Sequence, residues 1–220
     1  MKGVRIFMST SEVIGIYNKR AKRYNMSTLL LYNLLGMRIN RHRNLAVNAL
    51  GLKKGGTVVE IGCGTGANFP YLQKVIGPNG KIVGVDLTPS MLAEAKHRVE
   101  AKGWRNVELV ESGAAAYVFP ENVDAIISTF ALTMAPEYDD VIHRGSSSLR
   151  PGGKWVVMDF KMPTNWLKRF IPLLIHLVKP YGGTLEMTAR HPWESFEKYL
   201  SNVSVRQFWF GMAYIAEGER

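Results

Sequence analysis

Cysteine is almost absent from this chain of 220 residues, because Cys63 is the only one. A single thiol cannot form an intrachain disulfide, and the sequence contains no CxxC pair or Cys/His cluster with zinc-ligand spacing. We therefore expect no metal site and no dependence on an oxidising compartment. The N-terminus also lacks the apolar run and small-residue cleavage site of a signal peptide, which predicts a cytoplasmic protein.

Long hydrophobic runs are missing as well. The two most apolar segments are residues 29–37 and 170–178. Both are far shorter than the ~20 residues that a transmembrane helix needs. The sequence therefore predicts no transmembrane helix.

Acidic residues are scarce at the N-terminus. Residues 1–54 contain eleven Lys and Arg but a single acid, Glu12, so this segment holds the whole formal net charge of +10. Such segregation predicts an anionic partner near the N-terminus, either phospholipid or nucleic acid. Leucines interleave with these charges, which favours a membrane surface contacted through residues 1–44, on the inner face of the membrane. Nucleic acid is less favoured, because no RNA-binding module is present.

From about Thr57 the chain alternates β-rich runs with helical patterns. The predicted helices are 65–76, 89–102 and one from about 136. The segment 149–153 is a predicted turn. The predicted strands are 57–61, 81–86, 106–111, 123–129, 154–160, 203–210 and 212–219. The last two strands are joined so tightly at Gly211 that they must pair antiparallel. We therefore predict an α/β fold: a Rossmann-like, doubly wound, mostly parallel sheet with an antiparallel C-terminal hairpin over residues 45–220, preceded by a basic helical arm or cap over residues 1–44.

A glycine-rich turn follows the first predicted strand. Gly62, Gly64 and Ala67 satisfy the G-x-G-x-x-G/A spacing of dinucleotide sites, which alone is weak evidence. Glu60 separates the possibilities, because a carboxylate at this strand end repels a pyrophosphate but attracts a ligand that carries an ammonium and a sulfonium group. The segment therefore favours S-adenosyl-L-methionine over NAD.

A second carboxylate, Asp86, ends the second predicted strand, twenty residues after Gly66. A carboxylate at this place can accept hydrogen bonds from both hydroxyls of a ribose. Leu87 and Met91 would then lie near the adenine, although Met91 is equally well explained as a core residue of the following helix.

The segments VEIGCGTG, GVDLTPSML, VDAIISTFAL and LRPGGKWVV resemble the successive motifs of the class I S-adenosylmethionine-dependent methyltransferases. The resemblance covers about residues 45–160 and implies a seven-stranded sheet, S-adenosyl-L-methionine as cofactor and S-adenosyl-L-homocysteine as product. By position, it implies that Glu60 lies near the methionine moiety and Asp86 binds the ribose. It also implies that the cofactor loop is formed by Gly62, Cys63, Gly64 and Gly66. The pocket would be lined by Ser128, Thr129, Phe130 and Ala131.

One position departs from the pattern of similar chains. They commonly carry an Asp after the third strand that accepts from the adenine amino group, and Gly113 fills that place here. We expect Ser112 or Glu111, or backbone groups, to hold the adenine instead. Cys63 is not expected to be catalytic, because methyl transfer needs no covalent intermediate.

The acceptor is predicted from weaker resemblances. Residues 128–142 and 190–196 resemble bacterial phosphatidylethanolamine N-methyltransferases, and Tyr17 to Tyr24 resembles a Y-x-x-x-A-x-x-Y segment that caps the cofactor in lipid- and quinone-modifying relatives. N-methylation of a phospholipid amine headgroup is therefore the leading hypothesis. Its candidate acceptor-contacting and catalytic residues are Tyr17, Tyr24, Asp159, Tyr181, Arg190 and His191, each of which could instead be an ordinary packing, strand-end or surface residue.

Three alternatives remain open from the sequence. The second hypothesis is C-methylation of a quinone precursor, because related quinone-modifying enzymes share the arm and the motifs. An RNA methyltransferase would also explain the basic arm. A cofactor-binding interaction protein without activity is the non-enzymatic alternative. The sequence does not indicate an oligomeric state.

Overall fold

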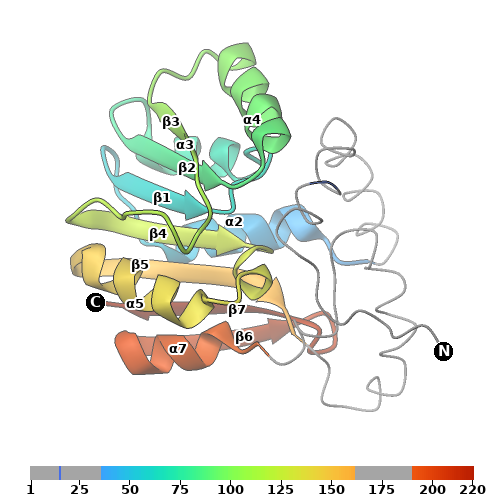
Figure 1. Cartoon of the computed structure of the whole chain (residues 1–220), viewed down its shortest axis with the longest axis vertical. Coiled ribbons are helices and arrows are strands. Elements are labelled where there is room, and N and C mark those ends of the chain that lie inside the picture. Colours follow the sequence, from blue (N-terminus) through green and yellow to red (C-terminus); the bar gives the residue numbers. More distant parts are fainter. Residues whose placement is uncertain (1–14, 16–35, 162–189) are drawn as a thin grey trace.

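The computed structural model describes Gly15 and residues 36–161 and 190–220 (Figure 1). The side chains of Tyr17, Tyr24 and Tyr181, for which the sequence predicted contacts, lie outside these described residues. Most of the apolar run 29–37 and all of the run 170–178 lie outside them as well.

The described part of the chain is built on one seven-stranded sheet with the order β3-β2-β1-β4-β5-β7-β6. Its strands are β1 Thr57–Ile61, β2 Lys81–Asp86, β3 Val107–Glu111, β4 Val123–Thr129, β5 Leu149–Phe160, β6 Ser201–Phe208 and β7 Ala213–Glu219. Strands β1 to β5 pair in parallel, whereas β7 pairs antiparallel with both β5 and β6. The predicted α/β fold with its antiparallel C-terminal hairpin is confirmed.

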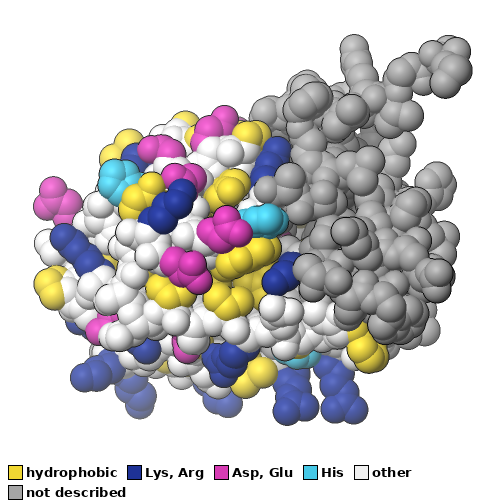
Figure 2. All heavy atoms as spheres, turned by 90° about the horizontal axis from the view of Figure 1, so that it is seen from below, with side chains coloured by type: hydrophobic (Ala, Val, Ile, Leu, Met, Phe, Trp, Pro, Cys, Tyr) yellow, Lys and Arg dark blue, Asp and Glu magenta, His cyan; other side chains and the backbone are white. Residues whose placement is uncertain are grey.

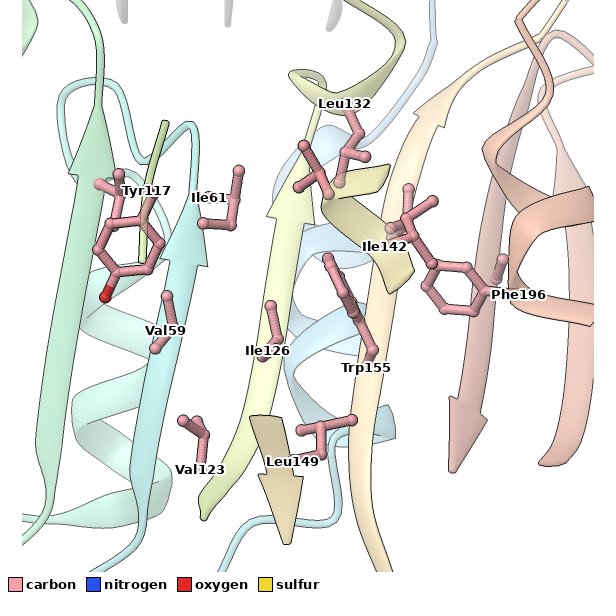
Figure 3. Packing of buried hydrophobic residues seen from close by; sticks show 14 of the residues in the cluster. Val59, Ile61, Tyr117, Val123, Ile126, Leu132, Ile142, Leu149, Trp155 and Phe196 are labelled. Carbon is pink, nitrogen blue, oxygen red and sulfur yellow. The ribbon is translucent and has the colours of Figure 1, made fainter. Parts of the chain in front are cut away.

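Helices cover both faces of this sheet (Figure 1). Helices α2 (Ile39–Ala49), α3 (Phe69–Ile76) and α4 (Pro89–Ala101) bury their apolar side chains in one hydrophobic cluster. Helices α5 (Tyr138–Ser148) and α7 (Pro192–Tyr199) share the other cluster. Figure 3 shows Trp155 of β5 pointing toward Ile142 and Phe196 at the centre of this second cluster. The two apolar layers hold the strand ends in fixed positions.

Several boundaries differ from the sequence prediction. The strand predicted over residues 203–210 is β6, which ends at Phe208, so Trp209 and Phe210 lie in the turn that follows. The segment 149–153, which was predicted as a turn, belongs to β5. Leu149 pairs with Val123, the register then shifts, and pairing resumes at Lys154. A β-bulge lets a strand keep its pairing across such a Gly-rich segment, so the glycines do not end the strand. The helix predicted from residue 65 begins at Phe69, and turns occupy residues 62–68.

Helix α2 was not predicted as a separate element, although it begins within the segment that was predicted as a helical arm. Its Ala46 and Val47 are fully buried against the sheet. The predicted division between an arm and a domain, at residues 44 and 45, falls inside this helix. Its first turns therefore continue directly into residues that are part of the core.

Candidate active site

The carboxyl ends of β1 and β4 form the point at which the strand order reverses. β1 pairs with β2 on one side and with β4 on the other, so the loops that follow β1 and β4 leave in opposite directions. In open α/β sheets, ligands bind in the crevice at such a point. The residues singled out at the ends of β1, β2 and β4 lie together at this edge.

The glycine-rich turn after β1 has a backbone that glycine adopts far more readily than other residues. Gly62, Gly64 and Gly66 have φ angles of 70°, 54° and 72°. The N–H groups of Gly62 and Cys63 donate to the Val85 carbonyl at 2.8 and 3.0 Å, which holds the turn against β2. A Cβ atom at Gly62 would overlap the Cβ atom of Ala131. The turn therefore lies close to the loop after β4.

Glu60 is buried, and one of its oxygens lacks a partner within the described part of the chain. Oε1 accepts a hydrogen bond of 2.7 Å from Asn68 Nδ2, whereas Oε2 has no partner among the described residues. Burial raises the pKa of Glu60 to about 8, against the lowering effects of the Arg43 charge and the Asn68 hydrogen bond. A buried carboxylate with a vacant acceptor atom favours a cationic hydrogen-bond donor as its ligand.

Arg43 and Asn68 complete the network around Glu60. Arg43 Nη1, from helix α2, donates to Asn68 Oδ1 at 2.9 Å and to Thr129 Oγ1 at 2.8 Å. Asn68 Nδ2 also reaches Thr129 Oγ1 at 3.0 Å. Helix α2, the turn before α3 and the end of β4 are therefore fixed to one another around a single carboxylate.

Asp86 fastens the glycine-rich turn from the end of β2. Oδ2 accepts from the Gly64 N–H at 2.8 Å and Oδ1 accepts from the Thr88 N–H at 2.9 Å. Burial raises the pKa of Asp86, and these two backbone donors oppose the rise. A carboxylate has about four lone-pair sites, so both oxygens retain acceptor capacity for a pair of hydroxyl groups.

The residues expected around an adenine lie beside Asp86. The Ser112 N–H donates to the Asp86 carbonyl at 3.0 Å. A Cβ atom at Gly113 would meet Leu87 Cδ1 at 3.6 Å, an ordinary contact. The Ser112 hydroxyl donates to the Gly113 carbonyl at 3.1 Å, which leaves its oxygen able to accept another hydrogen bond. Met91 is buried within α4, as its alternative core interpretation predicts.

The end of β4 carries a strained aromatic residue. Phe130 has a φ angle of 57°, which is unfavourable for a bulky side chain. Its ring centroid lies 4.7 Å from that of Phe160 at the end of β5, and the Arg43 guanidinium lies 5.6 Å from the Phe130 ring. Before it, Ser128 is fully buried, and its hydroxyl has no partner among the described residues. A strained backbone such as that of Phe130, at the edge of the sheet where ligands bind, is typical of functional sites.

Asp159 is not a solvated strand end, because it is almost completely buried. Oδ2 accepts from the Thr133 N–H at 3.0 Å, and Oδ1 accepts from the Phe160 N–H at 2.8 Å. Burial raises the pKa of Asp159 to about 6, against these hydrogen bonds. Arg190 Nη1 donates to the Thr133 carbonyl at 2.7 Å. Asp159 and Arg190 therefore hold the short helix η1 (Leu132–Met134) from two directions.

His191 lies next in the chain, at the start of α7. Its Nδ1 lies 2.9 Å from Glu194 Oε1, and its ring stacks on Trp193 with centroids 4.6 Å apart. The Nε2 atom of His191 is on the other side of the ring. Of the catalytic candidates proposed from sequence, His191 is thus a partly exposed imidazole and Asp159 a buried carboxylate.

Comparison with known proteins decides the family. Residues 6–208 match the model of the ubiE/COQ5 methyltransferase family. The chain belongs to this family. It is 30% identical to the ubiquinone/menaquinone biosynthesis C-methyltransferase UbiE of Hahella chejuensis, over 74% of this chain and 66% of that protein, just under two thirds of its length. It is 27% identical to the demethylmenaquinone methyltransferase of Bacillus cereus, over 91% of this chain and 92% of that protein.

Solved structures agree with the fold of this family. A SAM-dependent methyltransferase from Aquifex aeolicus superimposes with a TM-score of 0.59 at 23% identity, over 80% of this chain and 88% of that one. The resemblance to class I S-adenosylmethionine-dependent methyltransferases is therefore confirmed, as are the enzyme class and the cofactor.

The described residues fit the cofactor of the family. The vacant Oε2 atom of buried Glu60 suits the methionine ammonium, and Asp86 suits the ribose. The glycine backbone between them lets a ligand approach closely. When bound, S-adenosyl-L-methionine supplies an activated methyl group, so the protein's own task is to orient the acceptor and exclude water.

Two residues of the methyltransferase site were missed from the sequence. Arg43 was counted as one of many charges of the basic arm, and Asn68 carried no recognised signal. Arg43 is separated from Asn68 and Thr129 by 25 and 86 positions, so its hydrogen bonds depend on how α2 packs. Among the described residues, no helix is both long and apolar enough to cross a bilayer, and no group of His, Cys, Asp and Glu is arranged to hold a metal ion.

Proposed function

We propose that this methyltransferase transfers a methyl group from S-adenosyl-L-methionine to a ring carbon of a quinone precursor in its reduced, hydroquinone form. The observation that carries the proposal is the family match over residues 6–208, together with relatives that are named as C-methyltransferases of ubiquinone and menaquinone biosynthesis. Phospholipid N-methylation was the leading hypothesis from the sequence, but the comparisons give it no support. The quinone alternative replaces it.

The chemistry of such an acceptor agrees with the described side chains. A hydroquinone ring is planar and apolar, and the Phe130 and Phe160 rings offer an aromatic surface beside the cofactor site. The ring carbon becomes a better nucleophile when a neighbouring phenol is deprotonated. One C–C bond then forms, one S–C bond breaks, and the ring C–H proton leaves.

We propose His191 as the residue that accepts a proton from the acceptor. Its Nδ1 is oriented by Glu194, as in many histidine bases, and Nε2 remains for the acceptor. Asp159 is a poorer candidate, because both of its oxygens accept backbone hydrogen bonds and the side chain is buried. Asp159 and Arg190 instead position the loop after β4.

The test is a side-by-side transfer assay with cofactor labelled in its methyl group. Demethylmenaquinol, kept reduced with dithionite, and liposomes of phosphatidylethanolamine are offered separately to the purified protein. We expect label in the quinone fraction alone. Label in phosphatidylethanolamine and none in quinone would overturn the proposal. The variant His191→Asn should lower kcat about 100-fold with little effect on cofactor affinity, since general-base catalysis contributes on the order of 10²–10⁴ in rate.

A further inference from the structure

The turn between β6 and β7 presents two aromatic residues in an unfavourable backbone conformation. Trp209, Phe210 and Gly211 have consecutive φ angles of 51°, 58° and 80°. Only the glycine adopts this left-handed region readily, and aromatic residues are disfavoured there. The turn is closed by hydrogen bonds of 3.2 Å from the Gly211 N–H to the Phe208 carbonyl and from the Met212 N–H to the Trp209 carbonyl. The conformation is therefore a defined feature of the hairpin.

The strained conformation does not serve to bury the Phe210 side chain. Phe210 is 74% exposed, and it is the only aromatic residue among the exposed large hydrophobic side chains of the described residues. A single exposed apolar side chain is ordinary by itself, so the exposure of Phe210 gains meaning only from the aromatic and charged residues beside it. Trp209 is half-buried, and local conformational conflicts of this kind concentrate where a protein functions.

Topology places this turn at the edge of the sheet that carries the active site. β6 runs antiparallel to β7, and β7 runs antiparallel to β5, so Phe208 lies at the same edge as the carboxyl ends of β1 to β5. The Phe208 ring stacks on His42 of α2 with centroids 4.0 Å apart, immediately beside Arg43. The Lys161 N–H donates to the Met212 carbonyl at 3.0 Å.

Basic side chains lie near the turn at the start of α2. Arg38 and Arg41 are exposed there, on the helix whose His42 stacks on Phe208. Lys161 bonds to the turn through its backbone, and its ammonium lies over the Trp193 ring at 4.8 Å. Figure 2 shows that Lys and Arg side chains gather along one border of the described surface, away from most of the carboxylates. Aromatic residues flanked by cations are the combination that binds the interface of an anionic bilayer.

We propose that the Trp209–Met212 turn inserts into the surface of an anionic membrane and brings the active-site edge of the sheet against the bilayer. This extends the proposed function, under which the acceptor is dissolved in the membrane and must leave it to reach the cofactor. Phe210 enters the acyl region, Trp209 lies at the headgroup level, and Arg38 and Arg41 contact anionic lipid. The membrane contact predicted for residues 1–44 is a different surface, which shares only Arg38 and Arg41 with the one proposed for the turn.

The test is sedimentation of the full chain with sucrose-loaded vesicles, without acceptor or turnover, so its outcome does not depend on the proposed reaction. Vesicles of phosphatidylcholine alone are compared with vesicles that contain about 30 mol% phosphatidylglycerol, whose negative surface potential attracts basic side chains. We expect binding that requires the anionic lipid and is weakened by salt. Phe210→Ser should lower the partition coefficient about tenfold, the scale expected for one buried aromatic side chain.

Val118→Ser is the matched control. Val118 is 84% exposed on the loop between β3 and β4, whose Tyr117 carbonyl accepts from Arg144 of α5, on the opposite face from α2. It should bind vesicles like the wild type. Both variants should bind S-adenosyl-L-homocysteine normally in calorimetry, which shows that they are folded. Lipids brominated on the acyl chains should quench tryptophan fluorescence in the wild type and less in Trp209→Phe.

Three results would overturn the inference. The wild type could stay in the supernatant with both kinds of vesicle. Phe210→Ser and Val118→Ser could sediment alike. Finally, Phe210→Ser could change the oligomeric state in gel filtration while leaving vesicle binding intact, which would make the turn a contact between protein chains.

Discussion

Arg43 and Glu60 share one hydrogen-bonding partner, Asn68. The guanidinium donates to Asn68 Oδ1 at 2.9 Å, and Asn68 Nδ2 donates to Glu60 Oε1 at 2.7 Å. A buried carboxylate at the cofactor site is thus linked to a cation on a helix outside the motifs of the methyltransferase fold. The first predictions test this link.

Arg43→Met should weaken the binding of S-adenosyl-L-homocysteine. The substitution removes the hydrogen bonds to Asn68 and Thr129 and the charge that lowers the pKa of Glu60. We expect a loss of about tenfold to 100-fold, since charge-assisted hydrogen bonds contribute about 1.5–3 kcal/mol each. Isothermal titration calorimetry measures it. Arg41→Met, an exposed arginine on the same helix, is the control, and equal losses in both variants would contradict the role of Arg43.

Cofactor-product binding should tighten as the pH rises. The pKa of Glu60 is about 8 in the free protein, so the side chain is mostly neutral below that pH. A ligand ammonium favours the ionised form, and binding must release a proton. Affinity should rise close to tenfold between about pH 6.5 and 7.5, following the ionised fraction. Glu60→Gln should have a flat profile, and a wild-type profile equally flat would show that Glu60 does not face the ligand charge.

The same carboxyl group should limit stability at high pH. Its pKa is raised from 4.5 in the unfolded chain to about 8 in the folded one, so folding favours the protonated form. The associated stability is complete below about pH 4.5 and is lost as the pH rises toward 8. Glu60→Gln should therefore raise the free energy of unfolding at pH 8 by about 2 kcal/mol and change it little at pH 4.5. Urea unfolding at both pH values measures this, and equal effects at both would refute it.

The glycines of the turn after β1 should differ in how far their substitution by alanine destabilises the protein. Gly62→Ala meets both a φ angle of 70° and an overlap with the Ala131 side chain. Gly64→Ala meets an unfavourable φ of 54° but no heavy atom within 4 Å. We expect Gly64→Ala to cost about 1 kcal/mol of unfolding free energy and Gly62→Ala about 3 kcal/mol. Thermal unfolding ranks the two variants, and the reverse order would rule out the close approach of the two loops.

Asp159→Ala should destabilise the protein. The substitution leaves the buried N–H group of Thr133 and the partly buried N–H group of Phe160 without their acceptor. Each such group costs about 1–3 kcal/mol, so we expect a loss of about 3 kcal/mol in chemical unfolding. Asp140→Ala is the comparison, because Asp140 is exposed and its ion pair with Arg144 on α5 contributes less than about 1 kcal/mol. If Asp159→Ala lowered the free energy of unfolding by an equally small amount, the hydrogen bonds of Asp159 would not be important for stability.

The sequence predicts the parts of the site that are local. Glu60 and Asp86 end strands of strong hydrophobic pattern and adjoin glycines or a helix start, so a few neighbouring residues fix where they lie. The position of Arg43 depends on how α2 packs on the sheet, which no local pattern encodes. Asp159 illustrates a third case. Its place at the end of β5 was predictable, but its burial results from η1 and Arg190, which approach from elsewhere in the chain.

The position of α2 bears on how far the methyltransferase can be trimmed. A chain that starts at residue 45 would retain every strand of the described sheet and the buried pair Ala46 and Val47. It would lose Arg43, which donates to Thr129. It would also lose His42, whose ring stacks on Phe208 just before the Trp209–Met212 turn. Such a shortened protein could preserve the architecture while losing two neighbouring side chains, one for the nucleoside ligand and one for the hairpin.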